Sequence, residues 1–458
     1  MKSLARWKKV EDLREKLNGR AKAEGGYRFY SLHDKIYRKD FLEAAYAQCL
    51  ANDGAPGVDG KTFKDIEAHG VERYLRELAE ELKELRYLPQ PVRRVMIPKE
   101  NQPGKYRPLG IPTIRDRIVQ QAVKLLLEPI FEADFTDNAY GYRPGKSAQD
   151  ALTEVSTCLR SGHTEVVDAD LSKYFDTIPH QELMKSVERR IADHKVLWMI
   201  RKWLKTPVHE SNAKGKTVMS GGKKTKVGTP QGGVISPLLA NIYFRRFLVA
   251  WKQLGFEEKY KSKIVNYADD FVILTQGHAQ EALRTAHVLL TKIGLTLNET
   301  KTRTVNAWSE SFTFLGHTFG KLHGKGGRPY LGNTPSDKSV QKHREKVRQL
   351  TSADQTTKSL EDVTTALNRL TQGFWNYFKI GTVKKIARDL DQNLWEHMTG
   401  WAKRKYKRPH RRKQAGKSGQ ATRRARIQAA LDKLIWGQEL CRRRNGGPLF
   451  AAAASYAQ

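Results

Sequence analysis

Apolar positions near the start of the chain predict helices. The stretches LEAAYAQCL and VERYLRELAEELKELRYL place apolar residues three and four positions apart, which is the spacing of one helix face. Between them, GAPGVDGKTF contains the glycines and the proline of a loop. Residues 91–129 predict a short strand, a loop rich in glycine and proline, a second short strand and a helix. The N-terminal part is therefore predicted to be helical and to lead into a β-hairpin.

Residues 160–330 mix strand and helix patterns. The stretches EVVDADL, KIVNYADD, FVILT and FTFLGHTF are typical of strands, and SPLLANIYFRRFLVAWKQL is typical of a helix. Ser236 is predicted to cap this helix and Pro237 to occupy its first position. The pattern predicts an α+β region built on an antiparallel sheet.

After residue 334 the helical spacing returns. Three successive stretches each carry one apolar face, and together they predict a small helical bundle. The three faces are Val340, Val347 and Leu350; then Leu360, Val363, Leu367, Leu370 and Phe374; then Val383, Ile386, Leu390, Leu394, Met398 and Trp401.

The stretch VNYADDFVIL places two adjacent carboxylates, Asp269 and Asp270, between β-branched and aromatic residues. An Asp-Asp pair is unfavourable inside a strand and favourable in a turn, so we expect two short strands joined by a tight turn. Like charges this close repel each other unless a cation lies between them. The tip of the turn is therefore either solvated or a metal site.

A second acidic strand, EVVDADLSKYFDTI, places Asp168 and Asp170 on one face by alternation. If it lies beside the hairpin, one of these acids joins Asp269 and Asp270. Three converging carboxylates need counter-charge, which two Mg²⁺ ions would supply because magnesium takes oxygen ligands. Two such ions, about 3.5–4 Å apart, are what in-line phosphoryl transfer uses.

Composition points to a polyanionic partner. The 458 residues contain 82 Lys+Arg and 49 Asp+Glu, a net charge of +33, so nucleic acid is the expected partner. No run of 18 apolar residues is present to span a membrane, and the N-terminus lacks the apolar core of a secretory signal. Three scattered cysteines fit a reducing compartment. We expect a cytoplasmic protein, in the bacterial cytosol or associated with the nucleoid, without membrane partners.

Basic residues dominate the stretch WAKRKYKRPHRRKQAGKSGQATRRAR, which holds twelve Lys+Arg and no acid. Trp401 and Tyr406 are interleaved with these charges, a combination that favours nucleic-acid contact over a solvated tail.

Several longer blocks carry a family resemblance. The spacing from Asp170 to Phe175, followed by YADD, resembles the palm motifs of reverse transcriptases. The blocks RPLGIPTIRDRIVQQA, GYRPGKSAQDAL, GTPQGGVISPLLANIY, LNETKT and FLGHTF resemble those of group II intron reverse transcriptase/maturases, from about residue 40 to about residue 405. The resemblance implies an α+β right-hand polymerase with fingers, a palm built on an antiparallel sheet, a helical thumb and a basic C-terminal segment.

The resemblance also implies domain boundaries. Residues 1–85 would form the N-terminal extension and the start of the fingers, 86–160 the fingers, and 161–333 the palm. Residues 334–402 would form the helical thumb, called maturase domain X, and 403–458 a basic nucleic-acid-binding tail. The block GAPGVDG resembles the part of the N-terminal extension that covers the template.

By the same resemblance, Asp170, Asp269 and Asp270 would be catalytic and hold two Mg²⁺ ions, with Asp168 as the alternative on its strand. Phe175 matches the residue that selects deoxynucleotides, or it is an ordinary core phenylalanine. Lys301 matches a proposed proton donor to pyrophosphate, or it is a solvated lysine. The residues implied in dNTP binding are Lys99, Arg107, Phe175, Pro230, Gln231, Gly232 and Lys301.

The resemblance further implies that thumb and fingers enclose the template and product duplex. Arg115 and Arg117 are alternatives for gripping the triphosphate, and each could instead contact template backbone or an acid such as Asp116. The residues implied in nucleic-acid contact are Arg115, Arg117, Arg143, Lys379, Lys384, Lys385, Lys403, Arg404, Lys405, Arg411 and Arg412. The thumb aromatics Phe374, Trp375, Tyr377 and Phe378 are expected to be mostly core residues.

The function that follows is RNA-directed DNA synthesis by a maturase that binds group II intron RNA, assists its splicing and copies it into DNA. Its partners would be the intron RNA, an RNA template with a DNA primer, target DNA and dNTPs. Many relatives carry an H-N-H endonuclease with two cysteine pairs, which we do not expect here because only Cys441 lies after residue 405. Two alternatives remain: a domesticated reverse transcriptase in phage defence, DNA repair or CRISPR spacer acquisition, and a non-enzymatic RNA-binding splicing cofactor.

Overall fold

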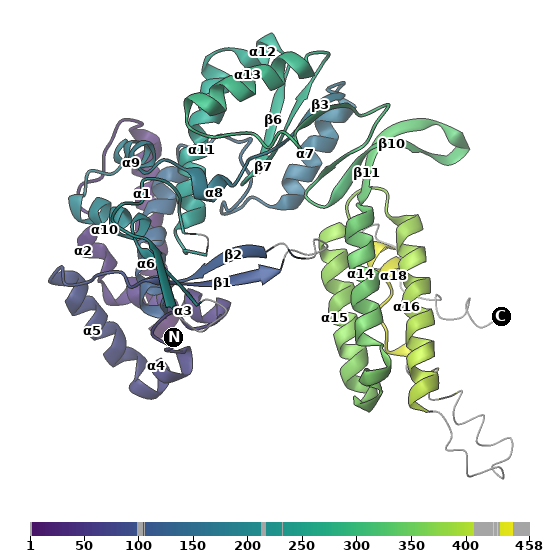
Figure 1. The fold of residues 1–458 in the computed structure, drawn as a ribbon, viewed down its shortest axis with the longest axis horizontal. Helices are drawn as coiled ribbons and strands as arrows, with labels where there is room; N and C mark the ends of the chain where they lie inside the picture. The colour runs from purple at the N-terminus through teal and green to yellow at the C-terminus, as the bar shows by residue number, and fades with distance from the viewer. Residues whose placement is uncertain are drawn as a thin grey trace. The chain divides into compact units, whose positions relative to one another are not determined.

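The computed structural model describes residues 2–98, 104, 106–211, 217–230, 232–406, 425, 428 and 431–442 (Figure 1). The chain divides into two compact units. Unit 1 comprises Met1–Ala151 and Ala169–Arg303, and unit 2 comprises Leu152–Asp168 and Thr304–Gln458.

The first part of unit 1 is helical, as the sequence predicts. The helix α6 is at its centre, and most of its apolar side chains are buried because α1 and α3 pack against it. The loop between α3 and α4 coincides with the predicted GAPGVDGKTF loop. The helices are α1 (Lys2–Ala23), α2 (His33–Ile36), α3 (Lys39–Asn52), α4 (Phe63–His69), α5 (Val71–Lys83) and α6 (Ile114–Glu132).

A four-stranded sheet with the order β2-β1-β4-β5 follows these helices in unit 1. The strands β1 (Val92–Pro98) and β2 (Tyr106–Ile111) form the predicted antiparallel hairpin, with Arg107 opposite Ile97. The strands β4 (Pro207–Ser211) and β5 (Thr217–Gly221) form a second hairpin, which the sequence patterns did not predict. The strand β4 pairs in parallel with β1, so the second hairpin joins the first in one sheet although the two are far apart in sequence.

A second four-stranded sheet has the order β6-β7-β3-β8. It contains the predicted acidic strands β3 (Glu165–Asp170), β6 (Lys263–Tyr267) and β7 (Asp270–Thr275), together with β8 (Arg303–Asn306). Asp168 and Asp170 are half-buried and Ala169 is buried, which confirms the predicted alternation. The helices of this region are α7 (Ala148–Arg160), α8 (Tyr174–Thr177), α9 (His180–Glu188), α10 (His194–Leu204), α11 (Ser236–Gln253), α12 (Phe256–Lys259) and α13 (Ala279–Lys292).

The start of α11 differs from the prediction by one residue. Its N-cap is Ile235, so Ser236 lies inside the helix and does not cap it. The Ser236 hydroxyl instead donates to the Pro230 carbonyl at 2.9 Å, and this bond fixes the preceding loop to the helix. The prediction of a Ser236 cap was wrong, because the helix begins at Ser236 and its hydroxyl bonds to the Pro230 carbonyl outside the helix.

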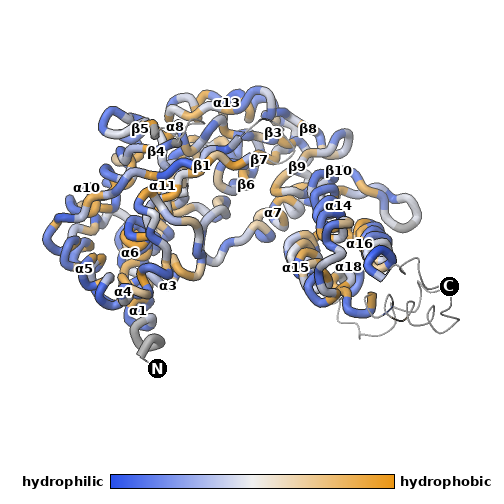
Figure 2. The backbone as a smooth tube through the Cα atoms, turned by 60° about the horizontal axis from the view of Figure 1, so that its bottom comes forward, coloured by the Kyte–Doolittle hydropathy of each residue, from blue (hydrophilic) through white to orange (hydrophobic). Residues whose placement is uncertain are grey.

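Unit 2 contains a three-stranded antiparallel sheet with the order β11-β10-β9, followed by the predicted helices. In these helices hydrophobic and hydrophilic residues recur at intervals (Figure 2), and the apolar faces meet in cores that contain Trp375 and Trp401. The elements are β9 (Phe312–Phe314), β10 (His317–His323), β11 (Pro329–Pro335), α14 (Asp337–Leu350), α15 (Leu360–Phe378), α16 (Lys384–Lys405) and α18 (Gly437–Arg442), with 3₁₀ turns at Lys325–Gly327 and Ala353–Thr357.

The fold class is α+β, as predicted. Helices and mostly antiparallel sheets alternate in groups along the chain, as expected for a right-hand polymerase. Among the helices of the described residues, none combines the length and apolar character needed to cross a bilayer.

Candidate active site at the YADD hairpin

The strands β6 and β7 form a tight antiparallel hairpin with Tyr267 opposite Asp270. Ala268 and Asp269 are the two turn residues, and Ala268 has a positive φ of 60°, which is uncommon for a residue with a side chain. The buried Asn266 stabilises this turn, because its amide nitrogen donates to the Ala268 carbonyl at 2.9 Å. The predicted strand–turn–strand with its acids at the tip is confirmed.

Residues 138–141 fix the turn from outside. The Asn266 nitrogen donates to the Asn138 carbonyl at 2.9 Å, and the Tyr140 nitrogen donates to the Asn266 carbonyl at 2.8 Å. A Cβ added to Gly141 would lie 2.6 Å from the Ala268 nitrogen, so only glycine fits without moving the turn. Asn241 on α11 donates to the Gly141 carbonyl at 2.7 Å. The position of Asp269 and Asp270 therefore depends on three segments far apart in sequence.

Asp170 is the last residue of β3, which is the neighbour of β7 in the sheet. Its Oδ2 atom accepts from Asn298 Nδ2 at 3.1 Å and lies 2.8 Å from Lys301 Nζ. Its backbone carbonyl accepts from the Asn298 nitrogen at 2.8 Å. Asp170 is thus held by the LNETKT block, and the Lys301 ammonium supplies positive charge at its carboxylate.

The predicted metal ligands do not form a ready-made cation site. Within the described part of the chain, no group of three or more His, Cys, Asp and Glu side chains is placed to hold a metal ion. The donor set nevertheless suits a hard divalent cation, because carboxylate oxygens from Asp170, Asp269 and Asp270 are the ligands that magnesium prefers. Lys301 already provides one cationic partner for this set, at Asp170. The metal site stays a prediction.

The loop that contains Pro230 and Gly232 packs against Phe175. Thr229 is buried and its nitrogen donates to the Phe175 carbonyl at 2.6 Å, while the Phe175 side chain is buried in the core. Gly232 has a φ of +101°, and a Cβ there would collide with the Gly110 carbonyl of β2. The structure therefore joins this loop to Phe175 through Thr229 and places Pro230 and Gly232 beside β2.

A cavity of about 180 Å³ lies between this loop and the sheet that begins with β1 and β2. Its lining includes Arg94, Asp176, Thr229 and Pro230. Arg107 is exposed on β2 and has an electrostatic influence on Tyr142. The predicted dNTP contacts Lys99 and Gln231 lie outside the described residues.

Tyr142 links the two sides of this region electrostatically. Its pKa is raised by burial and further by the negative charge of Asp269, and Arg107 opposes this rise. Its ring lies 6.5 Å from that of Tyr267, and half of Tyr142 remains exposed. Both Asp269, in the turn, and Arg107, the predicted triphosphate contact, therefore lie close enough to Tyr142 to influence its pKa.

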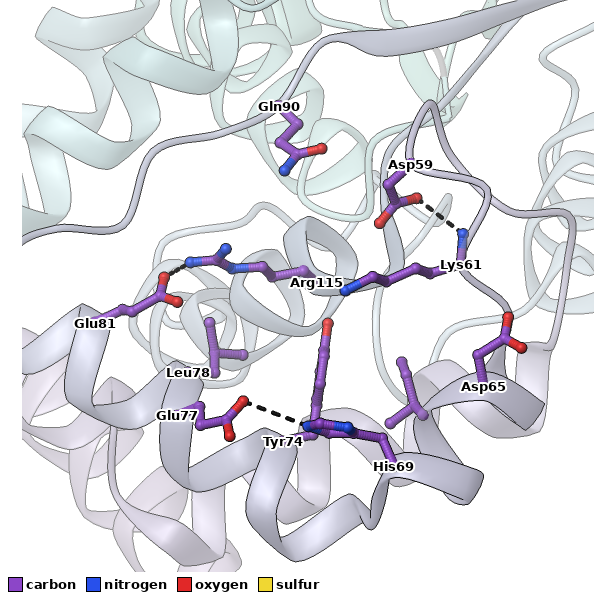
Figure 3. Close-up of a pocket in the computed structure, with 11 residues that line it drawn as sticks. Asp59, Lys61, Asp65, His69, Tyr74, Glu77, Leu78, Glu81, Gln90 and Arg115 are labelled. Atoms are coloured by element: carbon purple, nitrogen blue, oxygen red, sulfur yellow. Dashed lines mark hydrogen bonds and ion pairs between the residues drawn. The ribbon is translucent and has the colours of Figure 1, made fainter.

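Three arginines predicted to contact nucleic acid have side-chain partners within unit 1. Arg115 forms an ion pair with Glu81 at the edge of a pocket of about 390 Å³ (Figure 3). The guanidinium of Arg117 donates to the carbonyls of Pro112, Asp53 and Ala55.

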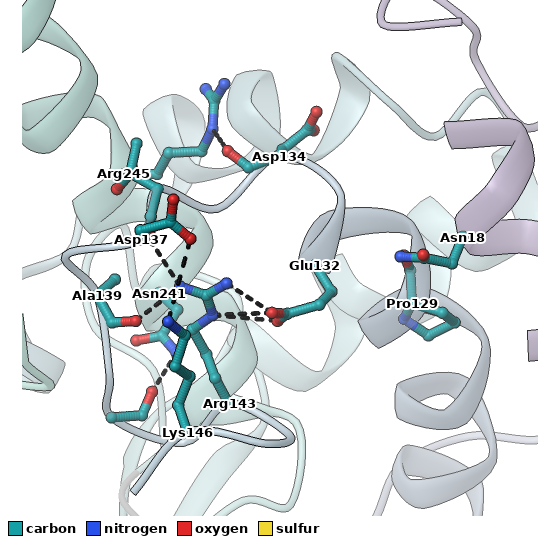
Figure 4. A network of polar contacts seen from close by, with 12 residues as sticks. Asn18, Pro129, Glu132, Asp134, Asp137, Ala139, Arg143, Lys146, Asn241 and Arg245 are labelled. Carbon is teal, nitrogen blue, oxygen red and sulfur yellow. Dashed lines mark hydrogen bonds and ion pairs between the residues drawn. The ribbon is translucent and has the colours of Figure 1, made fainter. Parts of the chain in front are cut away.

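Arg143 is buried and donates to Glu132 and to the carbonyls of Thr136 and Ala139 (Figure 4). These internal partners account for the three arginines, so we do not include them in a proposed nucleic-acid surface.

The basic residues of unit 2 that were predicted to contact nucleic acid are exposed, bonded to backbone carbonyls of the unit, or both. Lys379, Lys384 and Lys385 are exposed at the end of α15 and the start of α16. Lys403 and Arg404 are also exposed, although Arg404 donates to the Thr351 carbonyl at 2.6 Å. Lys405 donates to the carbonyls of Thr356 and Lys358. The predicted contacts Arg411 and Arg412 lie outside the described residues.

Trp401 is not available for stacking on a base. It is fully buried, and its Nε1 atom donates to the Gln355 carbonyl at 3.1 Å. Its interpretation as an aromatic of the nucleic-acid-binding segment was wrong, because the apolar face of α16 places it in the bundle core. Trp375 is buried as predicted, and Phe374 and Phe378 pack partly buried beside it.

Sequence reasoning missed the amides that hold the acids. Asn298, Asn266 and Asn241 each bond to the active-site segments; Asn298 and Asn241 lie inside blocks that carry the resemblance, and Asn266 directly precedes YADD, but none was predicted to have this role. The sequence does not show which residue Asn241 contacts, because its partner Gly141 is a hundred residues away.

Two family models match the chain. Residues 97–319 match a model described as reverse transcriptase (RNA-dependent DNA polymerase), and residues 340–419 match one described as the group II intron, maturase-specific domain. The sheet with its acidic turn thus belongs to a reverse transcriptase, and the helices of unit 2 include a maturase domain.

Individual relatives agree with this assignment. Protein YkfC of Escherichia coli (strain K12) is 36% identical over 346 residues, which are 67% of this chain and 87% of YkfC. The group II intron-encoded protein LtrA of Lactococcus lactis subsp. cremoris is 38% identical over 216 residues, which are 47% of this chain but only 34% of LtrA. The chain belongs to the family of group II intron-encoded reverse transcriptases and maturases, which confirms the predicted family and function at the level of its domains.

A solved structure of telomerase from Candida albicans, in complex with a fragment of telomeric RNA, is also similar. Its TM-score is 0.41 with 13% identity, and the match covers 83% of this chain and 71% of that chain.

Proposed function

We propose that the chain is a magnesium-dependent, RNA-directed DNA polymerase that binds a group II intron RNA, assists its splicing and copies it into DNA at a DNA target. The observation that carries the proposal is the placement of Asp170 at the end of β3, beside the strand that begins with Asp270. Retention of these acids within a reverse transcriptase domain supports catalysis and argues against a scaffold that only binds RNA. Its proposed location is the bacterial cytosol, where RNA and dNTPs are available.

Asp170, Asp269 and Asp270 are the residues that would hold two Mg²⁺ ions. When bound, such ions lower the pKa of an attacking hydroxyl and stabilise the charge on a leaving pyrophosphate. The chain itself orients the acids, since Asn298 fixes Asp170 and Asn266 fixes the turn that carries Asp269.

The dNTP would lie between the hairpin and the loop beside β2. In this arrangement Phe175 restricts the sugar, and Pro230, Gln231 and Gly232 approach the nucleotide with little side-chain bulk. Lys99 and Arg107 bind the triphosphate through charge-assisted hydrogen bonds. Lys301 moves from Asp170 to the leaving pyrophosphate and donates a proton to it.

RNA binding follows from the maturase domain and the net charge of +33. Residues 334–402 would act as the thumb and 161–333 as the palm, with 86–160 as fingers. The exposed Lys379, Lys384 and Lys385 are the proposed thumb contacts to the RNA–DNA duplex. Such contacts are dominated by phosphates, so affinity should fall steeply with salt.

The test is primer extension on an RNA template with Mg²⁺ and dNTPs. Wild-type protein should extend the primer, and both Asp170→Asn and Asp270→Asn should reduce the rate by at least about 10³-fold, because each removes a ligand of the cations that stabilise the transition state. Asp168→Asn is the matched control, since it removes a carboxylate from the same strand, and it should retain activity.

Splicing of a group II intron RNA is measured with the same variants. Asp270→Asn should still promote splicing, because that activity depends on RNA binding. Wild-type protein that promotes splicing and fails to extend any primer would overturn the proposal in favour of the non-enzymatic cofactor.

A further inference from the structure

A basic pocket lies in unit 1, and its lining includes none of the residues assigned to catalysis above. It has a volume of about 220 Å³ between the end of α6 and the helices α9 and α11. Four cationic side chains line it, namely Lys185, Arg189, Arg245 and Arg246. A water molecule occupies about 30 Å³ in the liquid, so the pocket can hold a tetrahedral anion together with several waters.

Arg245 is fixed in an unusual way for a basic surface residue. Its Nε atom donates to the backbone carbonyl of Asp134 at 2.7 Å (Figure 4). Among the described residues, its two terminal nitrogens have no hydrogen-bond partner. Since Arg245 lines the pocket, these two donors are available to a bound acceptor, in the fork geometry that suits a phosphate.

The acids near the pocket do not balance its cations. Asp134 pairs with Arg189 and also with Arg190, whose guanidinium is buried beneath it. Glu182 pairs with Arg246 at 2.9 Å and with Lys185 at 2.7 Å.

Three of the four cations in the lining thus share two carboxylates, one of which also pairs with Arg190, and Arg245 pairs with no carboxylate among the described residues. Burial lowers the pKa of Arg245, and the positive charges of Arg189 and Arg190 lower it further, while the negative charge of Asp134 opposes this fall. The cluster therefore repels itself in the free protein, and an anion in the pocket would relieve that repulsion.

We propose that this pocket binds a backbone phosphate of structured RNA and so serves as a docking point outside the polymerase site. The inference rests on the proposed RNA-binding function. RNA supplies the anion because the chain carries a net charge of +33 and a maturase domain. Phe131 and Ile242 form an apolar wall of the pocket, which lowers the local dielectric and strengthens a phosphate–guanidinium contact.

The test compares the affinity of full-length protein variants for a group II intron RNA over a range of salt concentrations. Arg245→Gln should weaken binding roughly tenfold, the loss expected for a hydrogen bond to a charged group. The dependence of log K on log salt should become less steep by about 0.7–0.9, the contribution of one phosphate contact. Extension of a short primer–template should stay at the wild-type rate.

Three further variants separate the pocket from general charge. Lys185→Gln should also weaken RNA binding, and it leaves the contact between Arg245 and Asp134 intact. Arg245→Lys keeps the charge but loses the fork, so it should recover only part of the affinity. Lys252→Gln removes an exposed charge from the same helix outside the pocket, and it should bind RNA like wild type.

Inorganic phosphate is the probe for the pocket without RNA. At equal ionic strength, sodium phosphate should raise the melting temperature of wild-type protein more than sodium chloride does, and this difference should shrink in Arg245→Gln. If Arg245→Gln and Lys185→Gln bind RNA as Lys252→Gln does, the proposal is overturned, even where phosphate stabilises the protein. Failure of the proposed function differs, because wild-type protein itself would then fail to extend primers.

Discussion

The Lys301 ammonium lies 2.8 Å from Oδ2 of Asp170, and this pair joins the LNETKT block to the end of β3. The lysine side chain is 62% exposed and the aspartate side chain 24% exposed. Lys301 therefore reaches the acid from the solvent side, where it can move away when a stronger cation or a phosphate approaches.

Replacing Lys301 tests whether it donates a proton to pyrophosphate. Lys301→Met should slow single-nucleotide incorporation by about 100-fold, within the range for loss of a general acid, while RNA affinity stays unchanged. Rapid-quench measurement of incorporation at saturating dNTP gives this rate. Lys301→Arg keeps the charge but cannot give up its proton readily, so it should remain slow; full recovery in that variant would show that only charge matters.

The close contact between Gly141 and the turn predicts a second loss of activity. Gly141→Ala places a Cβ 2.6 Å from the Ala268 nitrogen and 3.1 Å from the Tyr267 carbonyl carbon, so the hairpin must shift. Displacing Asp269 and Asp270 should lower the extension rate by about 100-fold, as expected for misplaced catalytic groups. Gly26→Ala, where nothing lies within 4 Å, is the control and should be active. A fully active Gly141→Ala protein would show that the turn tolerates movement.

Burial of His343 predicts acid sensitivity of unit 2. Burial, together with the positive charges of the neighbouring Lys346 and Arg344, lowers its pKa to about 4, and its ring centroid lies 4.7 Å from that of Phe374. The native state holds it neutral while the unfolded chain binds a proton below a pKa of about 6.5. The contribution of His343 to the free energy of unfolding is therefore fully present above pH 6.5. It is lost as the pH falls towards 4, and the total loss is about 3 kcal/mol.

Denaturant unfolding followed from pH 7 to pH 4 measures this effect. His343→Leu should flatten the pH dependence of unfolding, and it also removes two buried ring nitrogens that have no hydrogen-bond partner within the part of the chain that the structure describes. His323→Gln, at an exposed site on β10, should leave the pH profile unchanged. Equal acid sensitivity in His343→Leu and wild type would assign the effect to other groups.

The buried chain from Trp203 through Tyr87 to Asp116 predicts a stability effect in unit 1. Trp203 Nε1 donates to the Tyr87 hydroxyl at 3.0 Å, and that hydroxyl donates to Asp116 at 2.7 Å. Tyr87→Phe leaves the buried indole N–H without an acceptor and removes a donor from the buried carboxylate. The free energy of unfolding should fall by about 1–3 kcal/mol.

Urea denaturation of the purified variants provides that measurement. Tyr106→Phe, on the exposed surface of β2, is the control and should change stability by less than about 0.5 kcal/mol. An unchanged stability in Tyr87→Phe would mean that a water replaces the lost hydroxyl.

Much of this protein is readable from its sequence, because the informative signals are local. Alternation along EVVDAD and the Asp-Asp pair in YADD identify two strands and a turn, since strand periodicity and turn preference act within a few residues. The family blocks extend this reading to a reverse transcriptase with a maturase domain. The apolar faces of α14, α15 and α16 likewise predict the bundle.

Contacts between distant segments were decided only by the tertiary structure. The sequence could not show that Asn241 holds Gly141, that β4 extends the sheet beside β1, or that Arg143 is buried against Glu132. A basic residue looks the same in sequence whether it faces solvent or pairs inside the fold, because its environment is set by residues far along the chain. Local patterns thus determined the elements and the chemistry, whereas packing between them decided which charges remain available for ligands.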